Sequence, residues 1–344
     1  MSNTETREWL INVRISLLIL LAALMCLSTT ANATELRLNP AKVKGIDACG
    51  ECHKETVKAW KKTHHSTTFA DMPRSDEARE IADKMGIKRI KSESDCLTCH
   101  FTVAKEKGKE KPIAGISCES CHSAGKDWID IHSDFGGKDV KAENETPAHK
   151  VERYKKSEAA GMIRPGNLYA LAKNCYSCHT VPNEKLVNVG GHEAGSNFEL
   201  VRWSQGEVRH NLWYSDDNTE ADLNRRRMLY VIGKMLDLEY ALRGVAKATK
   251  KAQYAVAMAK RAKRALAFLK KIDKTVDNNE LTKIIAIAKK AKVSLNNEAV
   301  LTKAANSISA QAKMFSDKYD GSTLSGVDGA LPAPEKYRGT VFGE

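Results

Sequence analysis

The chain has 344 residues, of which 42% are apolar and 28% charged, a composition that is typical of a globular protein and excludes a largely disordered one. Its length allows two domains. The formal net charge is +12, but no basic face interleaved with aromatic residues is visible, so the excess charge does not indicate nucleic acid as a partner.

Residues 1–33 predict an export signal. Two arginines precede an apolar run over residues 17–27, and residues 31–33 (Ala-Asn-Ala) have the small-x-small form of a signal peptidase site. We therefore expect a cleaved signal peptide and a mature chain that starts near Thr34, in the periplasm or another exported location.

Two alternatives to cleavage stay open. The apolar run is well short of the roughly 20 residues that a membrane span needs, which weakens the case for a retained N-terminal anchor. Lipidation of Cys26 is weakened as well, because Met25 stands where a small residue is expected. The sequence thus favours cleavage over either form of membrane attachment.

The other eight cysteines all fall into C-x-x-C pairs, and each pair is followed at once by histidine. The four motifs are Cys49-Gly-Glu-Cys52-His53, Cys96-Leu-Thr-Cys99-His100, Cys118-Glu-Ser-Cys121-His122 and Cys175-Tyr-Ser-Cys178-His179. C-x-x-C-H is the attachment signature of haem c, in which two thiols bond the porphyrin and the adjacent imidazole binds the iron. The sequence therefore predicts four covalently attached haems, with all eight cysteines as attachment sites and the four motif histidines as iron ligands.

Zinc ribbons and thioredoxin-like redox pairs also use C-x-x-C, but neither needs the histidine. Zinc would require two pairs for each tetrahedral site and would leave four histidines unexplained. No strand–helix–strand pattern surrounds any pair, as a thioredoxin-like site would require. Haem remains the better interpretation.

Histidines outside the motifs decide what the irons can do. They are His64, His65, His132, His149, His192 and His210. An iron held by two imidazoles is saturated and suits electron transfer, whereas an empty sixth position can bind a small molecule. Six histidines are therefore candidates for the sixth coordination position of four irons.

The motifs and their surroundings resemble the cytochrome c-554 family of tetrahaem electron carriers. Residues 60–65 are similar to the family's W-x-x-[ST]-x-H, and His65 takes the position of the ligand histidine. Residues 115–122 are similar to its G-x-x-C-E-S-C-H-G, and His132 falls ten residues beyond, where the family has a second ligand. The resemblance spans about residues 45–180 and implies a largely helical fold that is low in strand.

The resemblance has limits and one open consequence. Ser123 replaces the usual glycine after the third motif, while residues 190–199 resemble a G-H-x-x-G-x-x-F-E segment of other multihaem cytochromes, which implies His192 as a ligand. The family leaves the iron of its second motif without a strong sixth ligand, so an inherited open site would belong to His100. The residues that could instead fill that position are His64, His149, His210, Met72 and Met85.

The motifs occupy a tetrahaem cytochrome domain that we place at residues 34–215. This segment has few long apolar runs, so we expect a core made mostly of porphyrin, with short helices and long loops around it. A polar stretch between His132 and Gly166 predicts an exposed loop or a frayed helix. The fold class is therefore mainly α, with a haem-packed domain followed by a helical bundle-like extension.

The extension, residues 216–320, shows apolar residues at helical spacing and predicts about four helices. The four series are Met228, Val231, Met235, Leu238 and Leu242; Met258, Ala262, Ala265, Leu269 and Ile272; Leu281, Ile284, Ile285, Ala288 and Leu295; and Leu301, Ala304, Ile308, Ala312 and Phe315. Thr219 is expected to cap the first helix, and Asp277 with Glu280 the third. The first helix is apolar on a second face and should lie between the haem domain and the other helices, while residues 321–344 predict a flexible tail.

Positive charge is concentrated in this extension. Residues 247–292 hold 14 Lys or Arg and 3 Asp or Glu. A solvated helical face is the simpler explanation. The alternative is a docking patch for an acidic redox partner protein or for an anionic membrane surface.

Electron transfer between redox partners through closely spaced, mostly bis-histidine haems is the function that the sequence favours. The alternative is a haem enzyme that acts on nitric oxide, hydroxylamine or nitrite at one five-coordinate haem. A structural or sensory module, with the helical extension binding a partner, is a third possibility.

Overall fold

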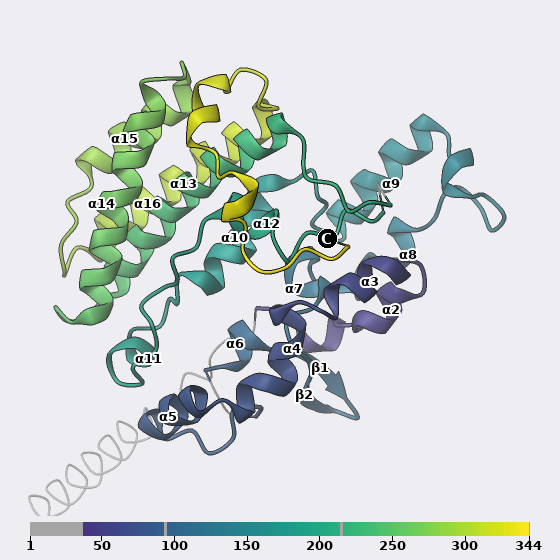
Figure 1. Ribbon diagram of the computed structural model, residues 1–344, viewed down its shortest axis with the longest axis horizontal. Coiled ribbons are helices and arrows are strands. Elements are labelled where there is room, and N and C mark those ends of the chain that lie inside the picture. The colour runs from purple at the N-terminus through teal and green to yellow at the C-terminus, as the bar shows by residue number, and fades with distance from the viewer. Residues whose placement is uncertain (1–36, 93–94, 214–215, 344) are drawn as a thin grey trace, which may run out of the picture. The chain divides into compact units, whose positions relative to one another are not determined.

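The computed structural model describes residues 37–92, 95–213 and 216–343, so the predicted signal peptide and cleavage site lie outside the described residues (Figure 1). The described residues form one compact unit. The predicted class is confirmed, since the described part is mainly helical, with a single two-stranded hairpin. None of its helices combines the length and hydropathy that a membrane span requires.

Short helices make up the segment that holds the four motifs (Figure 1). They are α2 (Ile46–Gly50), α3 (Lys54–Trp60), α4 (His64–Asp71), α5 (Asp76–Met85), α6 (Leu97–His100), α7 (Cys118–His122), α8 (Ile129–His132), α9 (Pro147–Ala159), α10 (Leu168–His179), α11 (Glu184–Asn188) and α12 (Leu200–Ser204). Short 3-10 turns join them: η1 (Pro40–Lys42), η2 (Met72–Arg74), η3 (Gly125–Asp127) and η4 (Ala142–Asn144). Apart from residues of α10 to α12, the buried apolar cluster here is small, comprising Ala82, Ile90, Cys96 and Phe101. This scarcity of packed side chains is consistent with a core that a prosthetic group would complete.

Local sequence explains two of these elements. Strands β1 (Thr102–Glu106) and β2 (Lys109–Ala114) are antiparallel and joined by Lys107-Gly108, whose φ angles of 47° and 79° match the two-residue turn that hairpins favour. In the polar stretch, α9 forms because Pro147 occupies its first turn and the Thr146 side chain accepts a hydrogen bond from the His149 N–H.

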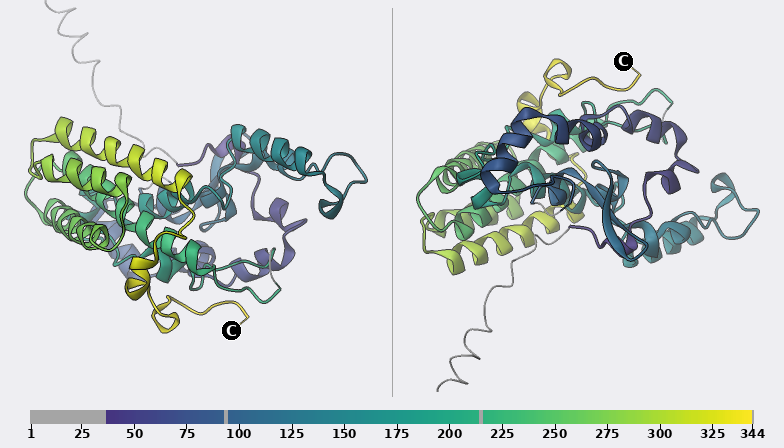
Figure 2. Two further views of the ribbon diagram at one scale, coloured as in Figure 1. Left: turned by 90° about the horizontal axis from the view of Figure 1, so that it is seen from above. Right: turned by 90° about the horizontal axis from the view of Figure 1, so that it is seen from below.

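The four predicted helices of the extension are confirmed as α13 (Leu223–Lys247), α14 (Gln253–Asp273), α15 (Asn279–Lys290) and α16 (Glu298–Lys318), which lie side by side in Figures 1 and 2. As expected, α13 is buried on all sides and contacts α10 and α12 as well as α14 and α16.

Three local details of these helices differ from the predictions. Asp222, not Thr219, caps α13, and Asn278, not Asp277, caps α15; each side chain accepts the N–H three residues on, at 2.8 and 2.9 Å. Leu295 lies beyond the end of α15. The competing cap residues stand one to three positions apart, so only the backbone geometry selects between them.

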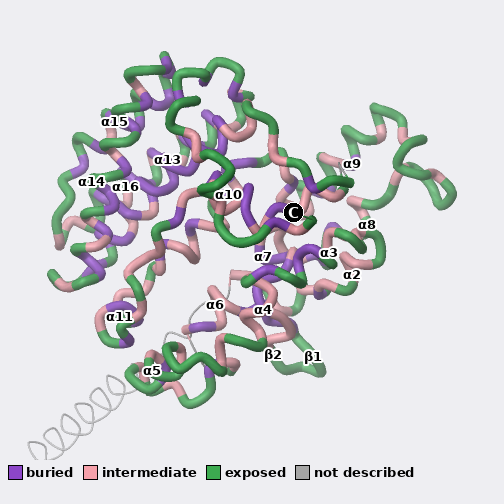
Figure 3. The backbone as a smooth tube through the Cα atoms, viewed as in Figure 1, coloured by how far each residue is buried: buried purple, intermediate pink, exposed green. Residues whose placement is uncertain are grey.

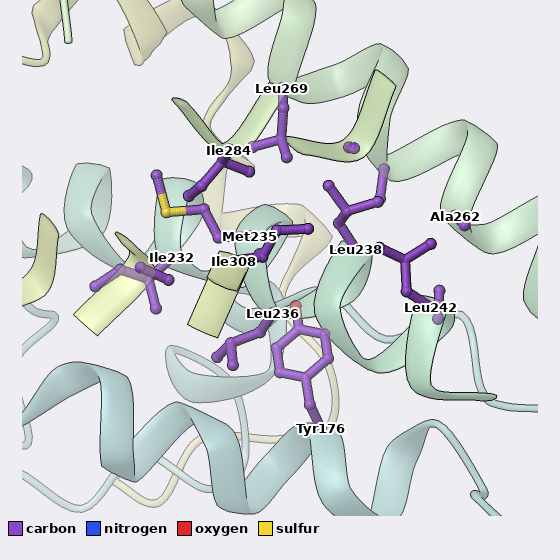
Figure 4. Close-up of a cluster of buried hydrophobic side chains, with 14 of the residues drawn as sticks. Tyr176, Ile232, Met235, Leu236, Leu238, Leu242, Ala262, Leu269, Ile284 and Ile308 are labelled. Atoms are coloured by element: carbon purple, nitrogen blue, oxygen red, sulfur yellow. The ribbon is translucent and has the colours of Figure 1, made fainter. Parts of the chain in front are cut away.

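The motif segment and the extension share one apolar core. Tyr176, which lies inside the fourth motif on α10, is 1% exposed and reaches the side chains of α13 (Figure 4). A Cβ atom at Gly233 of α13 would lie 3.0 Å from the Tyr176 hydroxyl oxygen, so a glycine allows this close approach. Packing is therefore continuous across the predicted domain boundary at residue 215.

Residues 321–343, predicted as a flexible tail, instead pack on α13 and α12. They include the 3-10 turns η5 (Ser325–Ala330) and η6 (Pro334–Lys336). Figure 3 shows how burial varies along the backbone. Leu324 and Val327 are each 1% exposed, and Arg227 of α13 donates to Asp328 at 2.6 Å. Two buried apolar side chains and an ion pair thus hold a segment whose prolines and glycines suggest disorder.

Candidate haem-binding site

Each C-x-x-C-H motif lies on a short helix or directly follows one. In the first motif, the His53 N–H donates to the Cys49 carbonyl at 2.9 Å; in the second, the His100 N–H donates to the Cys96 carbonyl at 3.0 Å. One helical turn therefore puts both thiols and the imidazole of a motif on one side of the chain. None of the eight described cysteines forms a disulfide, so all the thiols are available for other bonds.

Each motif histidine faces a second histidine ring. The ring centres are 6.4 Å apart for His53 and His132, 6.4 Å for His100 and His192, 6.5 Å for His122 and His210, and 6.0 Å for His179 and His65. Metal–imidazole bonds of about 2 Å on both sides of one iron place the two ring centres roughly 6 Å apart. The spacing of all four pairs therefore fits a haem iron between the rings.

The three histidines predicted as second ligands, His65, His132 and His192, each lie opposite a motif histidine. His210, which the sequence left among several candidates, lies opposite His122. The remaining two point elsewhere: His64 Nδ1 lies 2.5 Å from a Glu207 oxygen, and His149 Nδ1 lies 2.7 Å from a Glu145 oxygen. Met72 packs in the small cluster around Phe101, and Met85 lies close to Gly190.

Hydrogen bonds fix the imidazole tautomer at four of these rings. The Nδ1 atom contacts a backbone carbonyl in His122 (Ile163), His132 (Ile129), His192 (Glu193) and His210 (Val208). A carbonyl can only accept, so Nδ1 carries the proton and the lone pair stays on Nε2, as in a metal-bound histidine. His65 differs, because its buried Nδ1 lacks a partner in the polypeptide, the kind of unsatisfied atom that marks a site for a group outside the chain.

Burial keeps two of the motif histidines neutral. Burial, and then the nearby ring of His192, lowers the pKa of His100 to about 4. Burial, and then the ring of His65, lowers the pKa of His179 to about 4. Because the neutral imidazole is the form that binds a metal, both rings are ready to coordinate at neutral pH.

The motifs come together in two groups, which also contact each other, because the Asn174 side chain of α10 donates to the Cys121 carbonyl of α7 at 2.8 Å. The thiols of Cys49 and Cys118 contact each other, which joins the first motif to the third. The thiols of Cys99 and Cys178 do the same for the second and fourth motifs. The order of the motifs along the chain is therefore not their order in space.

Trp60 lies between the two groups. Its ring centre is 5.6 Å from that of His65, in the group of the second and fourth motifs, and 5.6 Å from that of His210, in the other group. The indole N–H donates to the Ile116 carbonyl at 2.9 Å, which fixes the ring. One tryptophan thus contacts a histidine from each group.

The C-E-S-C-H residues have structural roles that the sequence did not reveal. Glu119 is 1% exposed, and its carboxylate accepts the backbone N–H groups of Lys44, Gly45 and Gly125 at 2.6 to 2.9 Å. The Ser120 hydroxyl accepts the Ser117 N–H. Glu119 therefore fastens the segment before the first motif to the third.

Two further positions explain the flanking pattern. A Cβ atom at Gly115 would lie 2.4 Å from the His65 carbonyl oxygen and 2.7 Å from that of Ser66, so only glycine lets the strand end pass under α4. Ser123 has φ 73°, a left-handed conformation that favours the glycine which the resembling family carries there.

Comparison with known proteins agrees with this geometry. Residues 48–123 match the protein family described as cytochrome c554 and c-prime. The curated protein cytochrome c-554 of Nitrosomonas europaea is 26% identical over 147 residues, which cover 40% of this chain and 58% of the relative. The chain thus spans less than two thirds of the length of that relative. No solved structure matches the chain.

The family match covers the first three motifs and ends before the helical extension, so it concerns the haem-binding part of the chain. In this part the chain is similar to the cytochrome c-554 family of c-type haem proteins.

Proposed function

We propose that this protein is an exported tetrahaem cytochrome that transfers electrons between redox partners, with each iron held by two histidines. The observation that carries the proposal is the set of four facing imidazole pairs. Haem c, when bound, supplies one-electron exchange at iron. The chain supplies eight thiols for attachment and eight imidazoles.

Saturated irons favour electron transfer over catalysis. The sequence left open whether the iron of His100 lacks a second ligand, but His192 faces that ring at 6.4 Å. Among the described motif histidines, each has such a partner. Two imidazoles leave no position for nitric oxide, hydroxylamine or nitrite, so the arrangement supports an electron carrier.

The same packing supports a continuous route through the protein. Contacts between thiols join the motifs within each group, and Trp60 fills the space between His65 and His210. The Trp60 ring centre lies 5.6 Å from a histidine ring in each group, so one aromatic side chain links the two groups. The route therefore does not depend on the separation of the motifs in the sequence.

The partner that we propose is an acidic redox protein, which docks on the outer face of α14 and α15. Thirteen exposed basic side chains crowd this region: Lys247, Lys250, Lys251, Lys260, Lys263, Arg264, Lys270, Lys271, Lys274, Lys283, Lys289, Lys290 and Lys292. Within the described residues none of them has an ion-pair partner, whereas Glu280 is buried under Tyr319 and Lys318. A patch in which positive charge strongly predominates raises the rate of encounter with an oppositely charged partner.

The dependence of the electron-exchange rate on ionic strength distinguishes a docking patch from a basic face that is merely solvated. The rate of electron exchange with an acidic redox protein should fall steeply as ionic strength rises, and replacing Lys263, Lys270 and Lys274 with glutamine should flatten that dependence. If the rate of electron exchange changes neither with ionic strength nor with the substitutions, docking on this face is contradicted. Binding to anionic vesicles, with no salt effect on the protein partner, would assign the patch to a membrane surface instead.

The ligand assignment is tested by the spin state of the oxidised protein. Electron paramagnetic resonance should find only low-spin iron in the wild type and one high-spin iron in His192→Ala. His149→Ala is the matched control and should stay fully low-spin, since that ring bonds Glu145. A high-spin iron in the wild type that binds nitric oxide or cyanide would overturn the electron-carrier proposal in favour of the enzyme.

A further inference from the structure

A buried arginine of the helical extension reaches the fourth motif. Arg261 of α14 is 4% exposed, and its Nε donates to Asp237 of α13 at 2.6 Å. Its Nη1 donates to the Ser196 carbonyl at 3.1 Å, while its Nη2 is buried without a partner in the polypeptide. A positive charge that is only partly compensated therefore lies beside the segment containing Ser196.

Ser196 in turn contacts the histidine of the fourth motif at two points. The Ser196 N–H donates to the His179 carbonyl at 3.0 Å, and the His179 Nδ1 lies 3.1 Å from the Ser196 hydroxyl oxygen. Gly195 makes room for the arginine: it has φ 80°, and a Cβ there would lie 2.9 Å from Arg261 Nη1. The guanidinium is thus one residue removed from an iron ligand.

We propose that Arg261 is a positioning residue through which the helical extension sets the reduction potential of the fourth haem. The inference rests on the proposed electron-transfer function and names the part of the chain that tunes it. Reduction lowers the charge of an iron by one, so a nearby buried cation favours the reduced state and a nearby buried anion opposes it. Arg261 and Asp237 therefore act with opposite signs on the same haem.

The opposite signs distinguish tuning from a purely structural ion pair. Loss of a structural pair destabilises the fold whichever partner is removed, because the other charge is left buried and unpaired. Loss of a tuning pair moves the potential down when the arginine is removed and up when the aspartate is removed. The double substitution removes both charges and should return the potential toward that of the wild type.

The experiment is a spectroelectrochemical redox titration of the full-length, haem-loaded protein and its variants. Arg261→Gln should lower the ratio of reduced to oxidised iron for one of the haems by about tenfold at a fixed potential, which is about 59 mV for a one-electron couple. Asp237→Asn should shift one component in the opposite direction. Arg261→Lys, which keeps the charge, should stay close to the wild type.

The control is Arg227→Gln. It breaks the ion pair between Arg227, which lies on the same helix α13 as Asp237, and Asp328 of η5, and it should leave every potential unchanged. Circular dichroism and the haem content establish that each variant is folded and loaded. If Arg261→Gln does not accumulate as a folded protein, the potentials of Asp237→Asn and of the double variant are compared instead. Tuning predicts that the potential is raised in Asp237→Asn and returns toward the wild-type value in the double variant. Shifts of equal sign, or no shift in either single variant, would overturn the inference, while the spin-state count tests the electron-carrier proposal separately.

Discussion

Gly115→Ala is expected to displace His65, the proposed iron ligand opposite His179, without changing any histidine. The new Cβ would lie 2.4 Å from the His65 carbonyl oxygen and 2.7 Å from that of Ser66, although real Cβ atoms essentially never approach closer than 3.0 Å. The backbone of α4 must therefore move by at least about half an ångström at the residue that faces His179. Overpacking of this kind costs about 1–3 kcal/mol of stability.

The assay combines the spin state with thermal unfolding. We expect Gly115→Ala to convert part of one low-spin iron to high-spin and to lower the unfolding midpoint. Gly166→Ala is the matched control, because nothing lies within 4 Å of a Cβ built there. A Gly115→Ala protein with a fully low-spin spectrum and an unchanged midpoint would refute the argument that this glycine seats His65.

Three further outcomes follow from the described contacts. His210→Ala should produce one high-spin iron, whereas His64→Ala, whose side chain is 87% exposed, should leave the spectrum unchanged. Ser123→Gly should be more stable than Ser123→Ala by about 1–3 kcal/mol in chemical denaturation, since both lose the hydroxyl but only alanine keeps the strained φ; equal stabilities would exclude strain. The hydrogen bond from Arg153 lowers the pKa of Glu145 from 4.5 to about 2, so stability present above pH 4.5 should be lost as the pH falls toward 2. Glu145→Gln should remove that part of the pH dependence of unfolding, and an unaltered acid profile would contradict it.

The sequence predicted those parts of the site that depend on local spacing. The four motifs identify the cysteines and one histidine each, and the resemblance placed His65, His132 and His192 by their distance from a motif. His210 has no such spacing signal, because it meets His122 only after the chain has passed through α10 and α12. The sequence therefore indicates His210 only as one of several candidate second ligands.

The fold, like the site, was predictable where it depends on residues that are close together in the sequence. Helical periodicity identified α13 to α16, since it depends on neighbours three and four residues away. The tail was mispredicted because its order depends on the ion pair with Arg227 and on the apolar core that buries Val327, whose partners are distant in the sequence. Tertiary contacts override local composition at such points.

Tyr176 couples the fourth motif to the core of the helical extension. It stands between the two cysteines of the fourth C-x-x-C-H motif, yet its side chain is 1% exposed within the apolar core that α13 to α16 share. Unfolding the helical extension alone would leave this ring and the apolar side of α10 in water, and loss of order in α10 would in turn displace His179. The extension and the fourth ligand site should therefore melt in a single cooperative step, so that loss of helix and loss of one low-spin iron share one midpoint.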